Sequence, residues 1–563
     1  MRLFSVLPLI VTVALTLVLG GCGEMSSHDG AAHANHWSSG GQSEASQPQG
    51  GLYRDYGDAN VSQDAGATGG ADAGSSATSD AGSTAPKIPK SLPYVLASAQ
   101  ARSTFAADVD TASFDIFLRD LGYDVLPPSS TVRLEEYVNA FAYNDARPPT
   151  TGDVPFAISF ETALSPFDKD VRLVRVGLAG RKVQKDEKKA TNLVFLIDVS
   201  GSMQSSAKLP LVKKVISSAL NELDPTDTVS LVTYAGKTSV RLSPTVAKNA
   251  TTILSALNSL KASGSTNGAG GIQLAYQQAE KAFLAGGINH VVLCTDGDFN
   301  VGTSNTKALV KLIEEKRKTG ITLTVLGFGQ GNLNDSMMEA VSNAGDGIYA
   351  VIRDAKHAQM YGQDGLLATI QHIAKDVKIQ VQWNPQHVRA WRLLGYANRQ
   401  LTAQQFNDKT ADAGEIGSGH KVTAIFEVVM LKGEIPAPEY APKIVDTAPL
   451  SGGVTETLDV LKSDIALVKV RYKLPGAKAS DPSKEIQATL PTSWQPGDLA
   501  NASADLRWAT GVASMAEVLM GSPFRDKLDL KATRTLLSGS QGADADRIYA
   551  WPMIDKALNL LSK

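Results

Sequence analysis

Three short segments of the chain place oxygen-bearing side chains where a metal ion could be bound. Asp198, Ser200 and Ser202 lie at alternate positions in one segment, a glycine-rich loop follows at 264–268, and Thr-Asp-Gly-Asp follows a later apolar run at 295–298. Carboxylate and hydroxyl oxygens are the ligands that hard divalent cations accept. Aspartates from two of the segments can balance the charge of such a cation, and the hydroxyls add neutral oxygens, which leaves a coordination position open to water. We therefore expect a site for Mg²⁺ or Mn²⁺.

The surrounding residues predict the elements that position these side chains. Apolar runs typical of strands buried on both faces alternate with segments of helical spacing, which is the pattern of a largely parallel α/β sheet. The expected strands are 193–197, 229–234, 291–294 and 323–328, and the expected helices are 209–223, 271–283 and 307–317. Asp198 and Asp296 directly follow two of the strands. Open α/β sheets bind ligands at the carboxyl ends of their strands, so the predicted site lies there.

These residues resemble the metal-ion-dependent adhesion site of von Willebrand factor type A (VWA) domains. In that family, an Asp-x-Ser-x-Ser loop, a threonine on a second loop and an aspartate on a third surround one cation. Asp198, Ser200, Ser202, Thr266 and Asp296 match those positions in order. The resemblance implies a Rossmann-like VWA domain over 190–375 that grips an acidic residue of a partner protein through the cation. Such a contact is charge-assisted and needs no covalent chemistry.

The flanking segments resemble the N-terminal and C-terminal accessory regions of bacterial VWA lipoproteins. The matching runs are Asp-Val-Asp-Thr-Ala-Ser at 108–113, Val-Arg-Leu-Glu-Glu-Tyr-Val-Asn at 132–139 and Asp-Ala-Gly-Glu-Ile-Gly at 412–417. Hydrophobic periodicity predicts an N-terminal helical region at 96–152, strands at 153–185, a strand-rich region at 376–495 and a C-terminal helical region at 498–563. Because strands occur on both sides of the α/β domain, we expect 153–185 and 376–495 to form one discontinuous β-sandwich.

The first residues predict a lipid anchor. An apolar run from 7 to 19 ends in Leu-Gly-Gly-Cys, which resembles the lipobox of bacterial lipoproteins. Residues 1–22 are therefore expected to hold the signal peptide and the lipobox cysteine, with Cys22 lipidated. The resemblance implies a lipid-anchored protein of the cell envelope, and Gly23 in place of an aspartate favours the outer membrane. Residues 23–95 contain few large apolar side chains and predict a disordered linker.

Composition excludes other classes of protein. The 563 residues are 43% hydrophobic and 20% charged, as in globular proteins. The 54 Lys and Arg against 57 Asp and Glu leave a net charge of -3, so there is no positive excess for binding nucleic acid. The two cysteines, Cys22 and Cys294, lie in contexts too different for a disulfide framework, and Cys294 is expected to be a buried thiol in a strand.

The function expected from these features is metal-dependent protein recognition in envelope assembly or adhesion, without enzymatic activity. Two alternatives remain. The first is a Mg²⁺-dependent hydrolase, because phosphatases of another α/β class also place an acidic loop after the first strand. Such enzymes use a nucleophilic aspartate and a second acid, whereas serines follow Asp198 here. The second alternative is a structural envelope scaffold whose metal site is vestigial.

Overall fold

The computed structural model describes residues 91–148, 154–265, 269–297, 306–329, 333–436, 458–460, 462–478 and 480–563. The expected signal peptide, Cys22 and most of the expected linker lie outside the described residues, and so does Thr266. None of the helices within the described ranges is both long enough and apolar enough to cross a bilayer.

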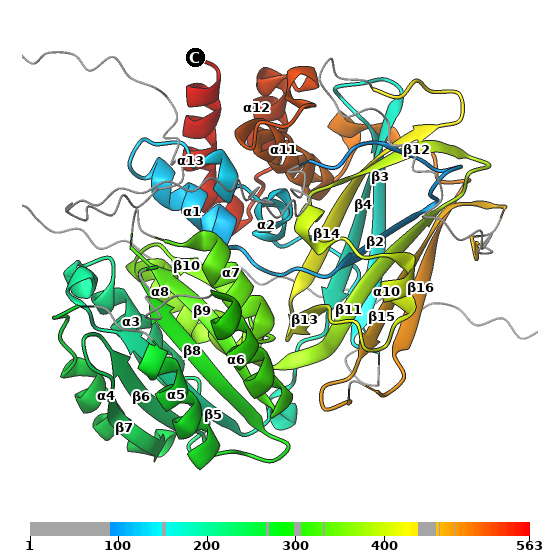
Figure 1. Cartoon of the computed structure of the whole chain (residues 1–563). Coiled ribbons are helices and arrows are strands. Elements are labelled where there is room, and N and C mark those ends of the chain that lie inside the picture. Colours follow the sequence, from blue (N-terminus) through cyan, green and yellow to red (C-terminus); the bar gives the residue numbers. More distant parts are fainter. Residues whose placement is uncertain are drawn as a thin grey trace, which may run out of the picture. The chain divides into compact units, whose positions relative to one another are not determined.

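The centre of the chain forms the predicted α/β domain around a six-stranded sheet (Figure 1). Its strands are β5 (Thr191–Asp198), β6 (Thr228–Tyr234), β7 (Ser239–Val246), β8 (Ile288–Thr295), β9 (Ile321–Phe328) and β10 (Tyr349–Ile352). Their spatial order is β10-β9-β8-β5-β6-β7, and every neighbouring pair is parallel except β6 with the edge strand β7. Chain order runs in opposite directions on the two sides of β5, so the sheet changes winding direction between β5 and β8.

Helices cover both faces of this sheet. Leu193, Phe195 and Ile197 of β5 join the core under α3 (Leu209–Leu220), α4 (Ala250–Asn258), α8 (Ala355–Met360) and α9 (Leu366–Ile370). Val194 and Leu196 point the other way, toward α5 (Ala269–Lys281), α6 (Thr306–Lys318) and α7 (Asp335–Ala344). Because side chains alternate along a strand, apolar residues at every position of β5 bury both faces.

A discontinuous β-sandwich flanks the α/β domain, as predicted from the strands on either side of it. One sheet has the order β1-β12-β14-β4-β3-β17 and the other β13-β11-β15-β16, with β2 also paired to β11. Apolar residues of both sheets share one core. The strands are β1 (Val95–Leu96), β2 (Arg102–Ala106), β3 (Phe156–Leu164), β4 (Val171–Gly180), β11 (His372–Trp383), β12 (Val388–Leu394), β13 (Gly414–Gly417), β14 (Lys421–Met430), β15 (Asp464–Lys473), β16 (Lys484–Pro491) and β17 (Gly497–Asp498).

Helices from both ends of the folded chain pack into one layer. They are α1 (Ala112–Leu121), α2 (Leu134–Asn139), α11 (Ala504–Leu519), α12 (Leu530–Ser538) and α13 (Ala545–Leu561), and their apolar faces form a common core. Ala112 and Ile116 of α1 also enter the core of the α/β sheet. The helix α1 therefore joins this layer to the α/β domain.

Two parts of the fold differ from the helical and strand-rich regions expected from sequence. Residues 102–106, within the expected N-terminal helical region, form strand β2 against Lys378–Gln382 of β11. A short helix, α10 (Ala403–Asn407), interrupts the strand-rich region. A five-residue strand paired to a segment far along the chain carries little periodicity of its own, which is why helical spacing dominated that region.

Candidate metal centre

The loop after β5 brings three of the expected ligands together. Asp198 is the last residue of β5, and Ser200 and Ser202 lie in the turn that follows it. The Ser200 N–H donates to Asp198 Oδ1 at 2.8 Å, which folds the turn back onto the aspartate. The two serine hydroxyls are 2.9 Å apart. Asp198 and Ser200 are buried, whereas Ser202 is exposed. This arrangement gathers a carboxylate and two hydroxyls at one end of the strand.

Asp296 reaches the same edge of the sheet from β8. The two strands are parallel, and Ile197, the residue before Asp198, pairs with Cys294. Asp296 lies two residues after Cys294, so it comes just beyond the end of β8, at the same edge of the sheet as Asp198. Asp296 is buried, and its negative charge adds to the rise that burial causes in the pKa of Asp198. The pair lies where the sheet changes winding direction, the position at which open α/β sheets bind ligands. The structure thus brings the two predicted aspartates into one electrostatic site.

The third predicted segment is described only in part. Thr266 lies outside the described residues, but the preceding residues of its loop contact the Asp198 loop. The Gly201 N–H donates to Gly264 O at 2.9 Å, and the Ser263 N–H donates to Val199 O at 2.7 Å. The two loops are therefore joined by backbone hydrogen bonds just before the predicted threonine ligand.

One carboxylate oxygen of the site is incompletely satisfied by the protein. Asp198 Oδ2 is buried and has no hydrogen bond of ordinary geometry to a described residue, although the Tyr234 hydroxyl interacts with the carboxylate and opposes the rise of its pKa. Burial raises the pKa of Asp198 to about 6, the Ser200 hydrogen bonds oppose that rise, and the Asp296 charge adds to it. A buried carboxylate oxygen without a donor costs free energy unless a cation approaches it. The residues present therefore fit a hard divalent cation held by Asp198, Ser200, Ser202 and Asp296.

A basic residue not anticipated from sequence also belongs to the site. The Lys208 ammonium, at the start of α3, lies 2.8 Å from Asp296 Oδ2. Its side chain is 13% exposed, and the Asp296 carboxylate is fully buried. Nothing in the spacing of Lys208 from the Asp-x-Ser-x-Ser loop signals this contact, because it depends on how the turn leads into α3.

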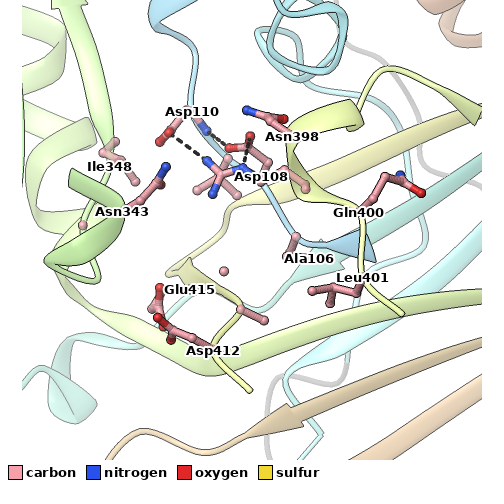
Figure 2. Close-up of a pocket in the computed structure, with 16 residues that line it drawn as sticks. Ala106, Asp108, Asp110, Asn343, Ile348, Asn398, Gln400, Leu401, Asp412 and Glu415 are labelled. Atoms are coloured by element: carbon pink, nitrogen blue, oxygen red, sulfur yellow. Dashed lines mark hydrogen bonds and ion pairs between the residues drawn. The ribbon is translucent and has the colours of Figure 1, made fainter. Parts of the chain in front are cut away.

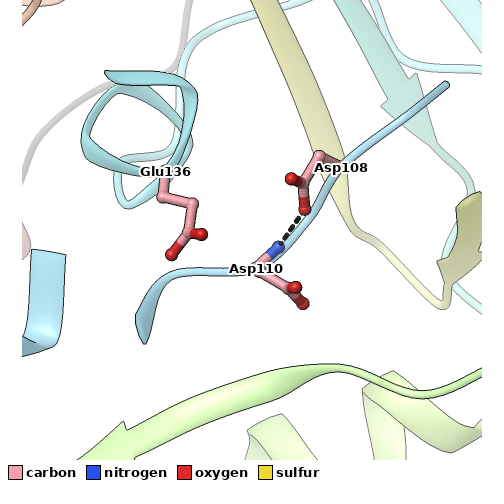
Figure 3. Close-up of side chains that lie close together, drawn as sticks. All are labelled: Asp108, Asp110 and Glu136. Carbon is pink, nitrogen blue, oxygen red and sulfur yellow. Dashed lines mark hydrogen bonds between the residues drawn. The ribbon is translucent and has the colours of Figure 1, made fainter. Parts of the chain in front are cut away.

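A second group of buried carboxylates lies outside this site, at Asp108, Asp110 and Glu136 (Figure 3). Every oxygen of the three accepts a hydrogen bond. The donors to Asp108 are the Asp110 N–H and Arg399 Nε, those to Asp110 are the Tyr349 N–H and Arg399 Nη2, and those to Glu136 are the Ser113 N–H and Arg133 Nε. This group is thus an internal ion-pair network that joins the N-terminal region to the α/β domain and the sandwich.

A cavity of about 210 Å³ opens beside that network (Figure 2). Its lining comes from three parts of the chain: the segment before α1, the α/β domain and the loops of the sandwich. Its polar side chains are Asp108, Asp110, Asn343, Asn398, Arg399, Gln400, Asp412 and Glu415. Two of the runs that resemble accessory regions of bacterial VWA lipoproteins, at 108–113 and 412–417, therefore meet at one cavity.

The other reactive side chains are buried away from the metal centre. Cys294 is a fully buried free thiol in β8, as predicted, and burial raises its pKa. His290, on the same strand, is buried, and desolvation lowers its pKa to about 3. It is therefore neutral at physiological pH. Gly329, in the glycine-containing turn after β9, has a positive φ of 83°.

Comparison with known proteins supports the division of the chain. Three family models match consecutive segments: one described as von Willebrand factor over residues 89–175, the von Willebrand factor type A domain over 192–363, and "Uncharacterized protein YfbK, C-terminal" over 368–556. The VWA model covers the α/β domain that carries Asp198 and Asp296. The chain thus contains a VWA domain, a fold used for protein interaction and adhesion and one that often binds a divalent metal.

Individual relatives match different lengths of the chain. The human inter-alpha-trypsin inhibitor heavy chain H4 is 30% identical over 24% of this chain and 16% of its own length. The solved structure of a von Willebrand factor type A protein from Catenulispora acidiphila covers 73% of this chain and 91% of its own, at 15% identity and a TM-score of 0.40. Escherichia coli YfbK is 35% identical over 78% of this chain and 75% of its own length. Since that similarity extends through the VWA domain and both flanking regions, the chain belongs to the YfbK family of bacterial VWA proteins.

Proposed function

We propose that this protein is a non-enzymatic binding module that recognises an acidic residue of a partner protein through a divalent cation at the end of β5. The observation that carries the proposal is the buried Asp198 carboxylate, whose Oδ2 has no hydrogen bond of ordinary geometry among the described residues and which lies beside the like charge of Asp296. A cation there is held by two aspartates and the serine hydroxyls. Its remaining coordination position is open to a carboxylate from outside. Mg²⁺ or Mn²⁺ suits these oxygen ligands.

Hydrolysis is the weaker alternative. A hydrolase of the kind considered needs a nucleophilic aspartate together with a second acid that donates a proton. Ser200 and Ser202 occupy the positions after Asp198, and the Asp296 carboxylate is paired with the Lys208 ammonium. Neither serine is a carboxylic acid, and the Asp296 carboxylate is held in an ion pair, so these neighbours do not supply the second acid that such a hydrolase uses.

Calorimetric titration with Mg²⁺ and with Mn²⁺ tests the site. Asp198→Asn removes the charge and keeps the shape of the side chain, so we expect its cation affinity to fall by at least about 100-fold, or roughly 3 kcal/mol. Glu222→Gln is the matched control, because Glu222 is an exposed acid of the same domain. Equal affinities in wild type and Asp198→Asn would refute the proposed site.

The partner is sought by capturing envelope proteins on the immobilised chain. Three conditions are compared: Mg²⁺, a chelator, and an Asp198→Ala/Asp296→Ala variant with Mg²⁺. A protein retained only in the first condition is expected, and mass spectrometry identifies it. An identical retained set under all three conditions would support the scaffold alternative and exclude recognition through the cation.

The proposal includes a lipid anchor at Cys22, which would place the folded part in the cell envelope and favours the outer membrane. The supporting observation is the lipobox-like run that ends in Cys22. Cys22→Ser is expected to abolish incorporation of a labelled fatty acid and to move the protein from the membrane fraction to the soluble fraction. Unchanged labelling of Cys22→Ser would show that the anchor is elsewhere.

A further inference from the structure

The Lys208 ammonium gives the metal centre a charge that its expected ligands do not account for. Asp198 and Asp296 together carry two negative charges, and Lys208 Nζ lies 2.8 Å from Asp296 Oδ2. The side chain of Lys208 is mostly buried, so the surrounding water screens this contact less than it would a surface pair. The described charged side chains of the site, Asp198, Asp296 and Lys208, therefore sum to one negative charge, whereas the two aspartates alone give two.

Lys208 also packs against Gly329. The aliphatic part of Lys208 lies against Gly329, where a Cβ would overlap it, and Gly329 also has a positive φ of 83°. The Gly329 carbonyl accepts a hydrogen bond from Arg119 Nη1 of α1 at 3.2 Å. Lys208 is thus confined between the turn after β9 and the Asp296 carboxylate, so it is a fixed charge and not a freely moving one.

A fixed positive charge affects the two binding steps of the proposed function in opposite ways. A divalent cation neutralises the two aspartates, and Lys208 then leaves the loaded site with one positive charge. The ammonium repels the incoming cation but attracts the carboxylate of the partner. This reasoning rests on the proposed function and adds a residue that sets its strength.

We propose that Lys208 is a charge-setting residue that weakens cation loading and strengthens carboxylate recognition by the loaded site. The competing explanation is that Lys208 only neutralises a buried carboxylate and supports the fold. In that case, removing the charge of Lys208 would lower the stability of the fold. The affinity for the cation and the affinity for the carboxylate would either both stay unchanged or shift in the same direction.

The test compares Lys208→Met, Lys208→Arg and Lys214→Met in the full chain. Methionine keeps an unbranched apolar stem without the charge, and arginine keeps the charge. Lys214 lies exposed on the same helix and serves as the matched control. Mn²⁺ affinity is measured by electron paramagnetic resonance. Acetate affinity of the Mn²⁺-loaded protein is measured from the relaxation of water protons, because a carboxylate that reaches the ion displaces water.

We expect Lys208→Met to bind Mn²⁺ about tenfold more tightly and, once loaded, to bind acetate several-fold more weakly, as removal of one nearby unit charge predicts. Lys208→Arg and Lys214→Met should stay close to wild type. Unchanged or weaker Mn²⁺ binding by a folded Lys208→Met would overturn the inference alone. If wild type bound no Mn²⁺, the proposed function itself would fail, so the two failures are distinguishable. Thermal unfolding without metal verifies that each variant is folded.

Discussion

Two of the groups of buried carboxylates in the protein differ in how their oxygens are satisfied. At the metal centre, Asp198 Oδ2 has no hydrogen bond of ordinary geometry among the described residues, and the like charge of Asp296 acts on it. In the network of Asp108, Asp110 and Glu136, arginines and backbone N–H groups donate to every oxygen. Both groups are acidic and buried, but only the first is left incomplete.

This difference separates a place that can take a ligand from one that cannot without rearranging. A completed network contributes to the fold, and a cation entering it would have to displace Arg399 or Arg133. A buried carboxylate that lacks a full set of hydrogen bonds is stabilised by a cation, because the cation supplies the missing electrostatic interaction. Acidic residues close together are therefore a poor indicator of a metal site until their donors have been counted.

The largest expected effect is on stability, in the completed network. Arg399→Met removes the guanidinium that donates to both Asp108 and Asp110, leaving buried charge uncompensated. The free energy of unfolding should fall by about 3–5 kcal/mol. Urea denaturation measures the change, and Arg525→Met is the control because the side chain of Arg525 is 55% exposed. An unchanged unfolding free energy for Arg399→Met would break the comparison, since the network would then contribute nothing to the fold.

The next largest effect is stabilisation by Mg²⁺, which only the incomplete site should produce. At a Mg²⁺ concentration about 100 times Kd, wild type should gain about 2.7 kcal/mol of stability by mass action. Asp198→Asn, with an affinity at least about 100-fold lower, should gain no more than about 0.4 kcal/mol. A folded variant of the other group, such as Glu136→Gln, should gain as much as wild type. Urea denaturation with Mg²⁺ and with chelator measures this. If the stabilisation by Mg²⁺ disappeared in Glu136→Gln, the cation would bind in the Asp108, Asp110 and Glu136 network and not at the end of β5.

The smallest expected effect sharpens the comparison through pH. Burial, together with the Asp108 charge, raises the pKa of Glu135 to about 7 from its ordinary value of 4.5. The protonated side chain stabilises the fold fully below pH 4.5, and this contribution is lost as the pH rises through 7. Glu135→Gln does not ionise, so at pH 8 it should be more stable than wild type by about 1–2 kcal/mol.

At pH 5 Glu135→Gln and wild type should unfold at nearly the same temperature. Calorimetric melting at both values of pH measures the difference, with Glu222→Gln as the exposed control. A stability gain of the same size at pH 5 and pH 8 would mean that ionisation of Glu135 is not its cause.

The α/β domain and most of its site were predictable because the signals are local. Leu193 to Ile197 form an apolar run that only a strand buried on both faces accommodates, and the Asp-x-Ser-x-Ser loop follows it directly. Asp296 follows a second run of the same kind. Once the strands are parallel, their carboxyl ends meet at one edge, so the approach of Asp198 to Asp296 follows from the order of elements.

The residues that were missed depend on contacts between distant parts of the chain. Lys208 is paired with Asp296, which lies 88 positions later in the chain, and Arg399 is paired with Asp108, which lies 291 positions earlier. Strand β2 is five residues long and acquires its conformation from pairing with β11. Such residues belong to no local periodicity or motif, because their positions depend on contacts with residues that only the folded chain brings near.

The insertion of the VWA domain between two strands of the sandwich has a mechanical consequence. Strand β4 leads into the domain and β11 leads out of it, and each is paired on both sides within its own sheet. The junction to β11 is short, since α9 ends at Ile370 and β11 begins at His372, whereas residues 181–190 separate β4 from β5. A force applied to the domain would therefore divide between the two sheets of the sandwich and would reach β11 through the shorter connection.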